Sequence, residues 1–435
     1  MPKIEPFRGV HYDPRRTWGL SPVIGPPQDL PDLEEAAKLI RRHPYHSLRL
    51  ELGDPGSDSW TSPELVRSLV FEHWRDEGIL VQPDEPVFFV HEHRYRYEGV
   101  YHRRLGLFAT ADLADDPKTG FRPHEATLRT NLQFRVDLLQ NLKLSISPIF
   151  TLIRDTGWLG MVLAEQVHGR PPDLSGHDTE EGVHRVWTLR DPNLISWLQD
   201  LIANQPLYIA DGHHRFAAAK AYRDRLVEQG VDPGPAGKVL TLIVSEFDPG
   251  VSILPIHREI RKMPESWELI EPRLTELFDV ECVLTEDQID PDLVGRRARR
   301  LAESFGDGPS FLMVRSGDPR LLRLIPRDPA AITRLIDQSI APEVRDLDAT
   351  VLHRVLMEQI LRIPPDDPDG VVSYLPDAAA ITRRVQAGES DLGLFMRNPR
   401  IEQVLAVADA GAHMPQKSTY FFPKIPAGLV MYDLG

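Results

Sequence analysis

The stretch from Leu207 to Asp224 reads LYIADGHHRFAAAKAYRD and decides how the rest of the chain is interpreted. The apolar run from Leu207 to Ala210 predicts a buried strand that ends at Asp211-Gly212. The alanine-rich residues that follow predict a helix beginning at His213. A strand that stops at a glycine and leads into a helix offers free backbone N–H groups and the positive end of the helix dipole. The stretch therefore predicts an anion-binding turn.

This turn carries chemically active side chains in close succession. Arg215 has a fork-shaped guanidinium that suits two phosphate oxygens, and Gly212 and His214 complete the predicted phosphate-binding set. Asp211 is a predicted Mg²⁺ ligand, directly or through water, because this ion favours a few carboxylates and keeps its waters. His213 and His214 are adjacent and point to different faces, so we expect one of them to reach a ligand. The alternative is an N-cap aspartate followed by polar surface residues, which explains one such residue more readily than four.

Composition excludes several classes of protein. The 435 residues carry 50 Lys+Arg against 65 Asp+Glu, and the net charge of −15 opposes non-specific binding to nucleic acid or to an anionic membrane. Cys282 is the only cysteine, so an intrachain disulfide and a cysteine-based zinc site are excluded, and its apolar neighbours predict a buried thiol on a strand. No apolar stretch reaches membrane-spanning length, and the first ten residues do not resemble a signal peptide. We expect a cytoplasmic protein whose oligomeric state the sequence leaves open.

Strand-like and helix-like segments alternate along the whole chain. This alternation predicts an α/β or α+β fold with mixed sheets. A boundary near Met263-Pro264 divides the chain into an N-terminal region, 1–263, and a further α/β region, 264–435. The predicted strands are 47–52, 87–93, 100–110, 147–153, 184–189, 239–246, 253–260, 280–285, 310–315, 321–326 and 370–375. The predicted helices, besides the one from His213, are 33–42, 62–77, 128–142, 191–204, 267–278, 290–305, 349–360, 378–387 and 400–410.

The segment from Gly411 to Lys424, GAHMPQKSTYFFPK, is aromatic and basic in an acidic chain. Lys417 and Lys424, with the hydroxyls of Ser418 and Thr419, suit contact with an anion. The alternative is a C-terminal strand with exposed lysines, and composition alone favours neither.

Several stretches together resemble one protein family. The DGHHR turn, the earlier PHEAT at 123–127, the SPIF strand at 147–150 and the terminal ADAGAHMPQKSTYFFPK resemble the bacterial and archaeal domain-of-unknown-function family 1015. The likeness runs from PFRGV at 6–10 to the C-terminus, and the terminal segment is its most specific part. The chain departs from the family pattern at Ala126, where a charged residue is usual, and at Gln28, where the family often has tyrosine.

The resemblance implies a fold and a range of activities. The strand–DGHHR–helix element is similar to the phosphate-binding turn of the ParB/sulfiredoxin superfamily, which contains partitioning CTPases, sulfiredoxin and free-serine kinases. It implies a ParB/sulfiredoxin-like mixed-sheet core that binds ATP or ADP, with CTP as a further candidate, together with Mg²⁺. By this likeness, Glu125 is the candidate base toward a hydroxyl substrate, with Asp211 and His213 as the other catalytic candidates. Lys417, Ser418, Thr419 and Lys424 would reach the phosphates if the C-terminal loop returns to the turn.

Three functions fit these residues. The first is a nucleotide- and Mg²⁺-dependent phosphotransferase that acts on a small hydroxyl compound such as free serine. The second is a nucleotide-binding regulator, and the third is a nucleotide hydrolase, in which water is the acceptor. Without the resemblance, Glu125 is equally well explained as a first-turn residue that interacts with a helix dipole. A transition-metal site that combines His213 with His124 or His413 is a weaker alternative, because adjacent histidines are poorly spaced as ligands on one helix.

Overall fold

The computed structural model describes residues 3–26, 33–53, 67–113, 120–127, 129–179, 182–203, 205–300, 308–365, 367 and 370–435. Two compact units make up the chain. Unit 1 contains Met1–Ser252 and Pro423–Gly435, and unit 2 contains Ile253–Phe422. The chain therefore passes into unit 2 after residue 252 and returns to unit 1 for its last residues. The departure at Gln28 lies outside the described residues.

A mixed nine-stranded sheet forms the centre of unit 1. Its strand order is β6-β11-β8-β12-β5-β4-β10-β9, with β1 paired to β5. β11 runs parallel to β6, and β12 runs parallel to β8, while the other neighbours are antiparallel. The predicted mixed α/β fold is confirmed. The strands are β1 (Ile4–Glu5), β4 (Phe88–Tyr97), β5 (Val100–Asp112), β6 (Phe121–Arg122), β8 (Ile149–Ile153), β9 (Leu174–His177), β10 (Val183–Leu189), β11 (Leu207–Asp211) and β12 (Lys238–Ser245).

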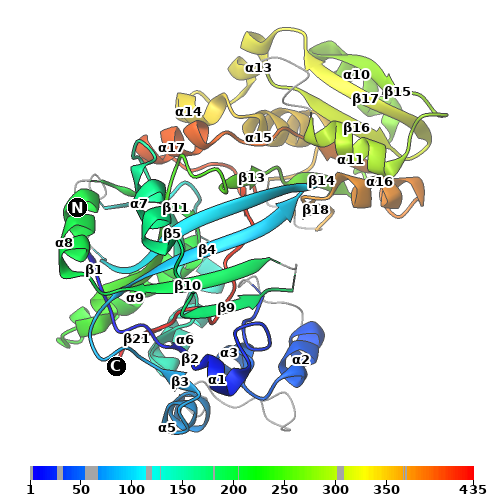
Figure 1. The fold of residues 1–435 in the computed structure, drawn as a ribbon. Helices are drawn as coiled ribbons and strands as arrows, with labels where there is room; N and C mark the ends of the chain where they lie inside the picture. Colours follow the sequence, from blue (N-terminus) through cyan, green and yellow to red (C-terminus); the bar gives the residue numbers. More distant parts are fainter. Residues whose placement is uncertain are drawn as a thin grey trace. The chain divides into compact units, whose positions relative to one another are not determined.

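The hairpin of β4 and β5 is the longest feature of this sheet (Figure 1). Its turn lies at Glu98-Gly99, and both of these residues have positive φ. The sequence-based strands at 87–93 and 100–110 are confirmed, and each strand is longer than predicted. The additional residues continue the alternation of side chains, since β4 pairs with β5 from Phe89–Phe108 to Tyr97–Val100.

Helices pack against the sheet and against one another in unit 1. α7 (Trp158–Val167) and α8 (Pro192–Ile202) bury leucine and isoleucine side chains in a core shared with the sheet. α6 (Arg129–Leu142) packs on α9 (His213–Glu228) through Val136, Ala218 and Tyr222. The smaller elements are β2 (His11–Tyr12), α1 (Pro14–Thr17), α2 (Leu33–Arg42), α3 (Leu48–Leu52), a π-helical turn η1 (Arg67–Glu72), α5 (His73–Asp76), β3 (Leu80–Val81), β7 (Leu144–Ser145), a 3-10 turn η2 (Gly234–Gly237) and β21 (Tyr432–Asp433).

Unit 2 contains a six-stranded sheet of order β15-β17-β16-β19-β14-β18. Two hydrophobic clusters lie in this unit, one around Phe278 and Phe311 and the other around Leu312 and Phe395. Its elements are β13 (Ser252–Leu254), β14 (His257–Ile260), α10 (Trp267–Leu277), β15 (Phe278–Leu284), α11 (Pro291–Arg299), β16 (Phe311–Arg315), β17 (Asp318–Pro326), α13 (Pro329–Leu335), α14 (Pro342–Arg345), α15 (Asp348–Val351), the π-helical η3 (Leu352–Ile360), β18 (Val372–Leu375), α16 (Ala378–Gln386), β19 (Leu392–Phe395), α17 (Ile401–Asp409) and β20 (Tyr420–Phe422).

Two local predictions are wrong. Residues 47–52 form the short helix α3 instead of a strand, and its buried leucines pack beside α2. The alternating leucines at 48, 50 and 52 suggested a strand, but one short turn of helix buries most of its residues when neighbours surround it. Cys282 is on a strand as predicted, yet it is exposed, because β15 is an edge strand with solvated side chains. Among the described residues, none of the helices has the length and apolar character required to cross a membrane.

Candidate functional site

The turn between β11 and α9 has the backbone geometry that the sequence predicts. Leu207 to Ala210 are buried, and α9 begins directly after Gly212, whose φ of 91° lies in the left-handed region. A residue with a Cβ is strained at this φ, so the glycine permits the tight passage from strand to helix. The free N–H groups of the first turn of α9 therefore lie beside the side chain of Asp211 at the end of the strand.

Asp211 is the electrostatic centre of this turn. Its Oδ2 accepts a hydrogen bond from Arg215 Nη2 at 2.7 Å, and its Oδ1 accepts one from Lys424. Burial alone would raise the pKa of Asp211, but Lys424 and Arg215 outweigh it and hold this pKa well below the usual carboxyl value. Arg215 also donates to the carbonyl of Pro148. The carboxylate thus remains ionised and fixes two cationic side chains.

His213 connects the turn to the PHEAT segment. The backbone N–H of His124 donates to His213 Nε2 at 3.4 Å, and the two rings meet edge to face with centroids 4.6 Å apart. Burial first, and then His124, lowers the pKa of His213 well below its usual value, so its imidazole is neutral. Since Nε2 accepts a hydrogen bond, the proton is on Nδ1, which lies 3.9 Å from Glu125 Oε2. The structure therefore brings Glu125 and His213 together, 88 positions apart in the chain.

The other predicted residues divide between the two units. His214 is half-buried on α9, and Lys424 lies with Asp211 in unit 1. Lys417, Ser418 and Thr419 belong to unit 2. In that unit Lys417 is exposed, whereas Ser418 is buried and its hydroxyl donates to the carbonyl of Pro415.

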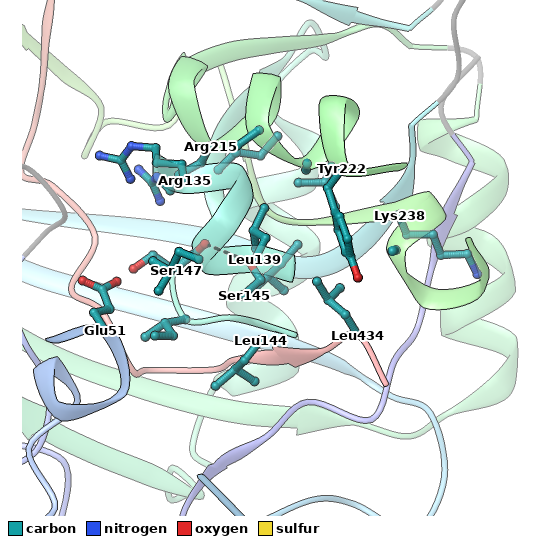
Figure 2. A pocket seen from close by; sticks show the side chains of 18 residues that line it. Glu51, Arg135, Leu139, Leu144, Ser145, Ser147, Arg215, Tyr222, Lys238 and Leu434 are labelled. Carbon is teal, nitrogen blue, oxygen red and sulfur yellow. Dashed lines mark hydrogen bonds between the residues drawn. The ribbon is translucent and has the colours of Figure 1, made fainter. Parts of the chain in front are cut away.

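A hollow of ≈ 660 Å³, its open mouth included, adjoins Arg215 (Figure 2). Arg135, Arg215 and Glu51 lie at one end, near Ser147, and Tyr222 and Lys238 lie at the other. The walls between these ends are mostly apolar side chains of α6, α9, β7, β8 and β12. The described residues that line it are Glu51, Arg135, Leu138, Leu139, Leu144, Ser145, Ile146, Ser147, Ile149, Arg215, Ala218, Ala219, Tyr222, Ala236, Lys238, Val239, Leu240 and Leu434.

Glu51 is the one acidic residue among the described residues that line this hollow. Its side chain is buried, with 7% of the residue exposed, and its Oε1 has no hydrogen-bond partner among the residues that the structure describes. Burial raises the pKa of Glu51 to about 7, although Arg135 and Arg215 oppose this rise through their charge. A buried carboxyl that titrates near neutral pH and opens on a pocket has the properties of a general acid or base.

The site residues predicted from the sequence did not include Glu51, Arg135 or Ser147. Glu51 was not selected because residues 47–52 were interpreted as a strand, whereas they form the helix α3. Arg135 carried a usable signal, because it lies three positions after Leu132 and four before Leu139, along the apolar side of α6. A charged residue on the apolar side of a helix is a candidate to line a pocket.

The carboxylate of Asp211, as it lies in this structure, does not fit a protein-held Mg²⁺ ion. Mg²⁺ needs at least one available carboxylate, and the two oxygens of Asp211 each accept a hydrogen bond from a cationic side chain. Within the described part of the chain, the one group of three residues with metal-ligand geometry is His93, Asp178 and His184, which lies elsewhere in unit 1. That group includes neither His213 nor His124 nor His413.

Comparisons with known proteins give one family and several distant structures. A family profile described as "Protein of unknown function (DUF1015)" matches residues 4–350. No curated protein matches the chain. A conserved hypothetical protein from Pyrococcus furiosus is 14% identical with a TM-score of 0.34, and the match covers 76% of this chain and 95% of that chain. A free serine kinase in complex with AMP is 14% identical with a TM-score of 0.36, over 74% and 91% of the two chains. C-terminally truncated SbnI from Staphylococcus aureus is 11% identical with a TM-score of 0.37, over 72% and 84%.

Proposed function

The chain belongs to the DUF1015 family of proteins of unknown function, and from this premise we propose that unit 1 binds a nucleoside di- or triphosphate and transfers a phosphoryl group from it to a small hydroxyl compound. We further propose that the β11–turn–α9 element is a phosphate-binding turn of the ParB/sulfiredoxin type. The nucleotide would be ATP, ADP or CTP, bound with its own Mg²⁺ as the metal–nucleotide substrate. Free serine is the first acceptor to test.

The polarity of the hollow carries this proposal. A nucleotide has a flat, mostly apolar base at one end and several negative charges at the other. The hollow has Tyr222, leucine side chains and Lys238 at one end, and Arg135 and Arg215, together with Glu51, at the other (Figure 2). Arginine forks suit phosphate oxygens, and an aromatic ring with aliphatic neighbours suits a base.

Asp211 and Lys424 have a positioning role in this proposal. Arg215 is held by Asp211 and by the carbonyl of Pro148, so its guanidinium is ordered before a ligand arrives. An ordered cation loses less conformational entropy when a phosphate binds. Asp211 pairs with Lys424 as well as with Arg215. Its single negative charge therefore neutralises Arg215 only in part, and Arg215 keeps positive charge for a phosphate.

Glu51 is the proposed proton acceptor. The hydroxyl oxygen of the acceptor attacks the terminal phosphorus, a new O–P bond forms, and the bond from that phosphorus to the bridging oxygen breaks. The hydroxyl proton passes to the Glu51 carboxylate, and the nucleotide leaves with one phosphate fewer. A pKa of about 7 suits this transfer, because half of the carboxyl groups are ionised at neutral pH while the group remains basic. Glu125, beside His213, is the competing candidate for the same role.

Binding is tested by calorimetric titration of ATP, ADP and CTP into the full chain with Mg²⁺. Arg135→Met and Arg215→Met should each weaken binding by about 10- to 100-fold, the effect of losing a charge-assisted hydrogen bond of about 1.5–3 kcal/mol. Arg41→Met is the matched control, because Arg41 is exposed at the end of α2, away from the hollow, and should leave the affinity unchanged. Equal affinity in all four proteins would exclude the hollow as the nucleotide site.

Transfer is tested separately by phosphorus NMR with ATP or ADP, Mg²⁺ and a panel of hydroxyl compounds that includes serine. Glu51→Gln should retain nucleotide affinity and lose turnover, whereas Glu125→Gln should retain both. The opposite pattern would assign the base to Glu125. Nucleotide binding without any phosphorylated product would identify a regulatory protein, and release of inorganic phosphate alone would identify a hydrolase.

A further inference from the structure

A second polar cluster lies on a different part of the unit 1 sheet, around the pairing of β4 with β10. His93 and His184 stand directly opposite each other in this antiparallel pair. Directly opposed residues project to the same face of a sheet. Their rings accordingly lie with centroids 4.0 Å apart, and neither side chain is exposed to solvent.

Asp178, in the connection between β9 and β10, completes the cluster. Its Oδ2 lies 2.9 Å from His184 Nε2 and 3.6 Å from His93 Nε2. Its other oxygen, Oδ1, accepts a hydrogen bond from the backbone N–H of Gly182 at 2.8 Å, which fixes the orientation of the carboxylate. One ligand atom from each of the three residues lies within 4.8 Å of the others. Tetrahedral ligands at the usual zinc distances stand about 3.4 Å apart, so these positions need only small shifts to surround an ion.

His93 Nε2 provides the observation that points to a ligand. This nitrogen is fully buried and, within the described part of the chain, has no hydrogen-bond partner. A Cβ atom on Gly182 would lie 2.5 Å from this nitrogen and 2.7 Å from Asp178 Oδ2. The absence of a side chain at Gly182 therefore leaves open the space between the two atoms that an ion between them would occupy.

His91 forms a hydrogen bond with the ring of His184. His91 Nε2 lies 2.9 Å from His184 Nδ1, and the two rings are nearly parallel, at 3°. A histidine that binds a metal through Nε2 carries its proton on Nδ1 and commonly donates it to a neighbouring acceptor. In this structure His184 Nε2 donates to Asp178, so His91 Nε2 donates to His184 Nδ1; when a metal binds, His91 Nε2 can accept the proton of His184 Nδ1 once its own proton has moved to its Nδ1.

Arg104 weakens metal binding, because its guanidinium forms a hydrogen bond with His93. Its Nη2 lies 3.3 Å from His93 Nδ1, and a guanidinium can only donate, so the proton of His93 is on Nε2 in this structure. Metal binding moves this proton to Nδ1 and ends the hydrogen bond. Arg104 retains its other bond, from Nη1 to the carbonyl of Pro423 at 2.8 Å, and its place over the ring of Phe150. The site is therefore expected to bind less tightly than one without a neighbouring cation.

We propose that His93 Nε2, His184 Nε2 and Asp178 Oδ2 form a binding site for one divalent transition-metal ion of the Zn²⁺ or Fe²⁺ type. Two imidazoles and one carboxylate suit these ions, whereas Mg²⁺ and Ca²⁺ prefer sites built from oxygen. Three protein ligands leave at least one coordination position for water or a small ligand. This site is independent of the proposed nucleotide site, because it shares no residue with the hollow.

The test uses the full chain, freed of metal by a chelator and titrated with Zn²⁺ in competition with a chromophoric chelator. Co²⁺ serves as a spectroscopic probe, because its visible bands report imidazole and carboxylate ligands. Wild type should bind one equivalent of each ion. His184→Asn and Asp178→Asn should weaken binding at least 100-fold. His177→Asn is the matched control, since His177 is exposed and immediately precedes Asp178; it should bind as wild type does.

Gly182→Ala tests the same site without removing a ligand. Its methyl group would occupy the space between His93 and Asp178, so Zn²⁺ binding should fall although all three ligands remain. Circular dichroism and thermal unfolding without metal show whether each variant is folded, and Zn²⁺ should raise the unfolding temperature of wild type and His177→Asn alone. Failure of wild type to bind Zn²⁺ and Co²⁺, or wild-type affinity in a folded Asp178→Asn or Gly182→Ala protein, would overturn the proposal.

Discussion

Replacing Glu51 by glutamine should change the pH dependence of stability in a calculable way. In the unfolded chain this carboxyl ionises above its ordinary pKa of 4.5, whereas in the folded protein burial delays ionisation to about pH 7. Between these values unfolding releases a proton, so rising pH favours the unfolded state by about 1.4 kcal/mol per pH unit. The folded state therefore loses about 3 kcal/mol by pH 8, and the loss is absent below pH 4.5. Glutamine has the same shape and does not ionise, so Glu51→Gln avoids this loss.

Urea unfolding followed by tryptophan fluorescence, from pH 5 to pH 8, measures the difference between the two proteins. The free energies of unfolding should agree within about 1 kcal/mol at pH 5 and diverge until Glu51→Gln is the more stable by about 3 kcal/mol at pH 8. Glu228→Gln, at an exposed position on α9, is the control and should follow wild type at every pH. A difference that stays constant with pH, or a variant less stable at pH 8, would refute the inference that a buried carboxyl titrates near neutrality.

Three further substitutions test other parts of the structure by the same unfolding measurement. Lys424→Met leaves one oxygen of Asp211 without its cation and should cost about 2 kcal/mol; adding Asp211→Asn should recover part of the loss, and no loss would contradict the ion pair. Gly250→Ala places a methyl group against main-chain atoms of β5 and should cost more than about 3 kcal/mol, whereas Gly308→Ala, with none of the described residues within 4 Å, should cost under about 1 kcal/mol. Asp377→Ala removes an N-cap that accepts from two backbone N–H groups of α16 and should cost about 1 kcal/mol; an unchanged stability would show that solvent replaces it.

The sequence predicted local features that depend on neighbours along the chain. The passage from β11 to α9 follows from an apolar run, a glycine and an alanine-rich stretch, all within Leu207–Asp224. The hairpin of β4 and β5 follows from two β-rich runs on either side of Glu98-Gly99. The approach of Glu125 to His213 came from the family resemblance, and the structure places these residues together without testing their roles.

The rest depends on strand register and on packing between distant segments. His93 and His184 meet because β4 and β10 pair in one register, and a shift by a single residue would turn either ring to the opposite face. Glu51 of α3 and Arg135 of α6 line the same hollow, and no periodicity in either segment indicates that they lie close together. Such sites are properties of pairing, and a single sequence does not specify which segments pair.

The return of the chain to unit 1 after residue 422 has a consequence for biosynthesis. The last residues bring Lys424 to Asp211, Met431 into a bridge with Val10, and Tyr432 into pairing with Ser145. A ribosome releases these residues after all of unit 2, so unit 1 remains incomplete while unit 2 is being made. During that interval Asp211 has Arg215 as its cationic neighbour and lacks Lys424. The turn thus acquires its final charge balance only after unit 2 has been synthesised.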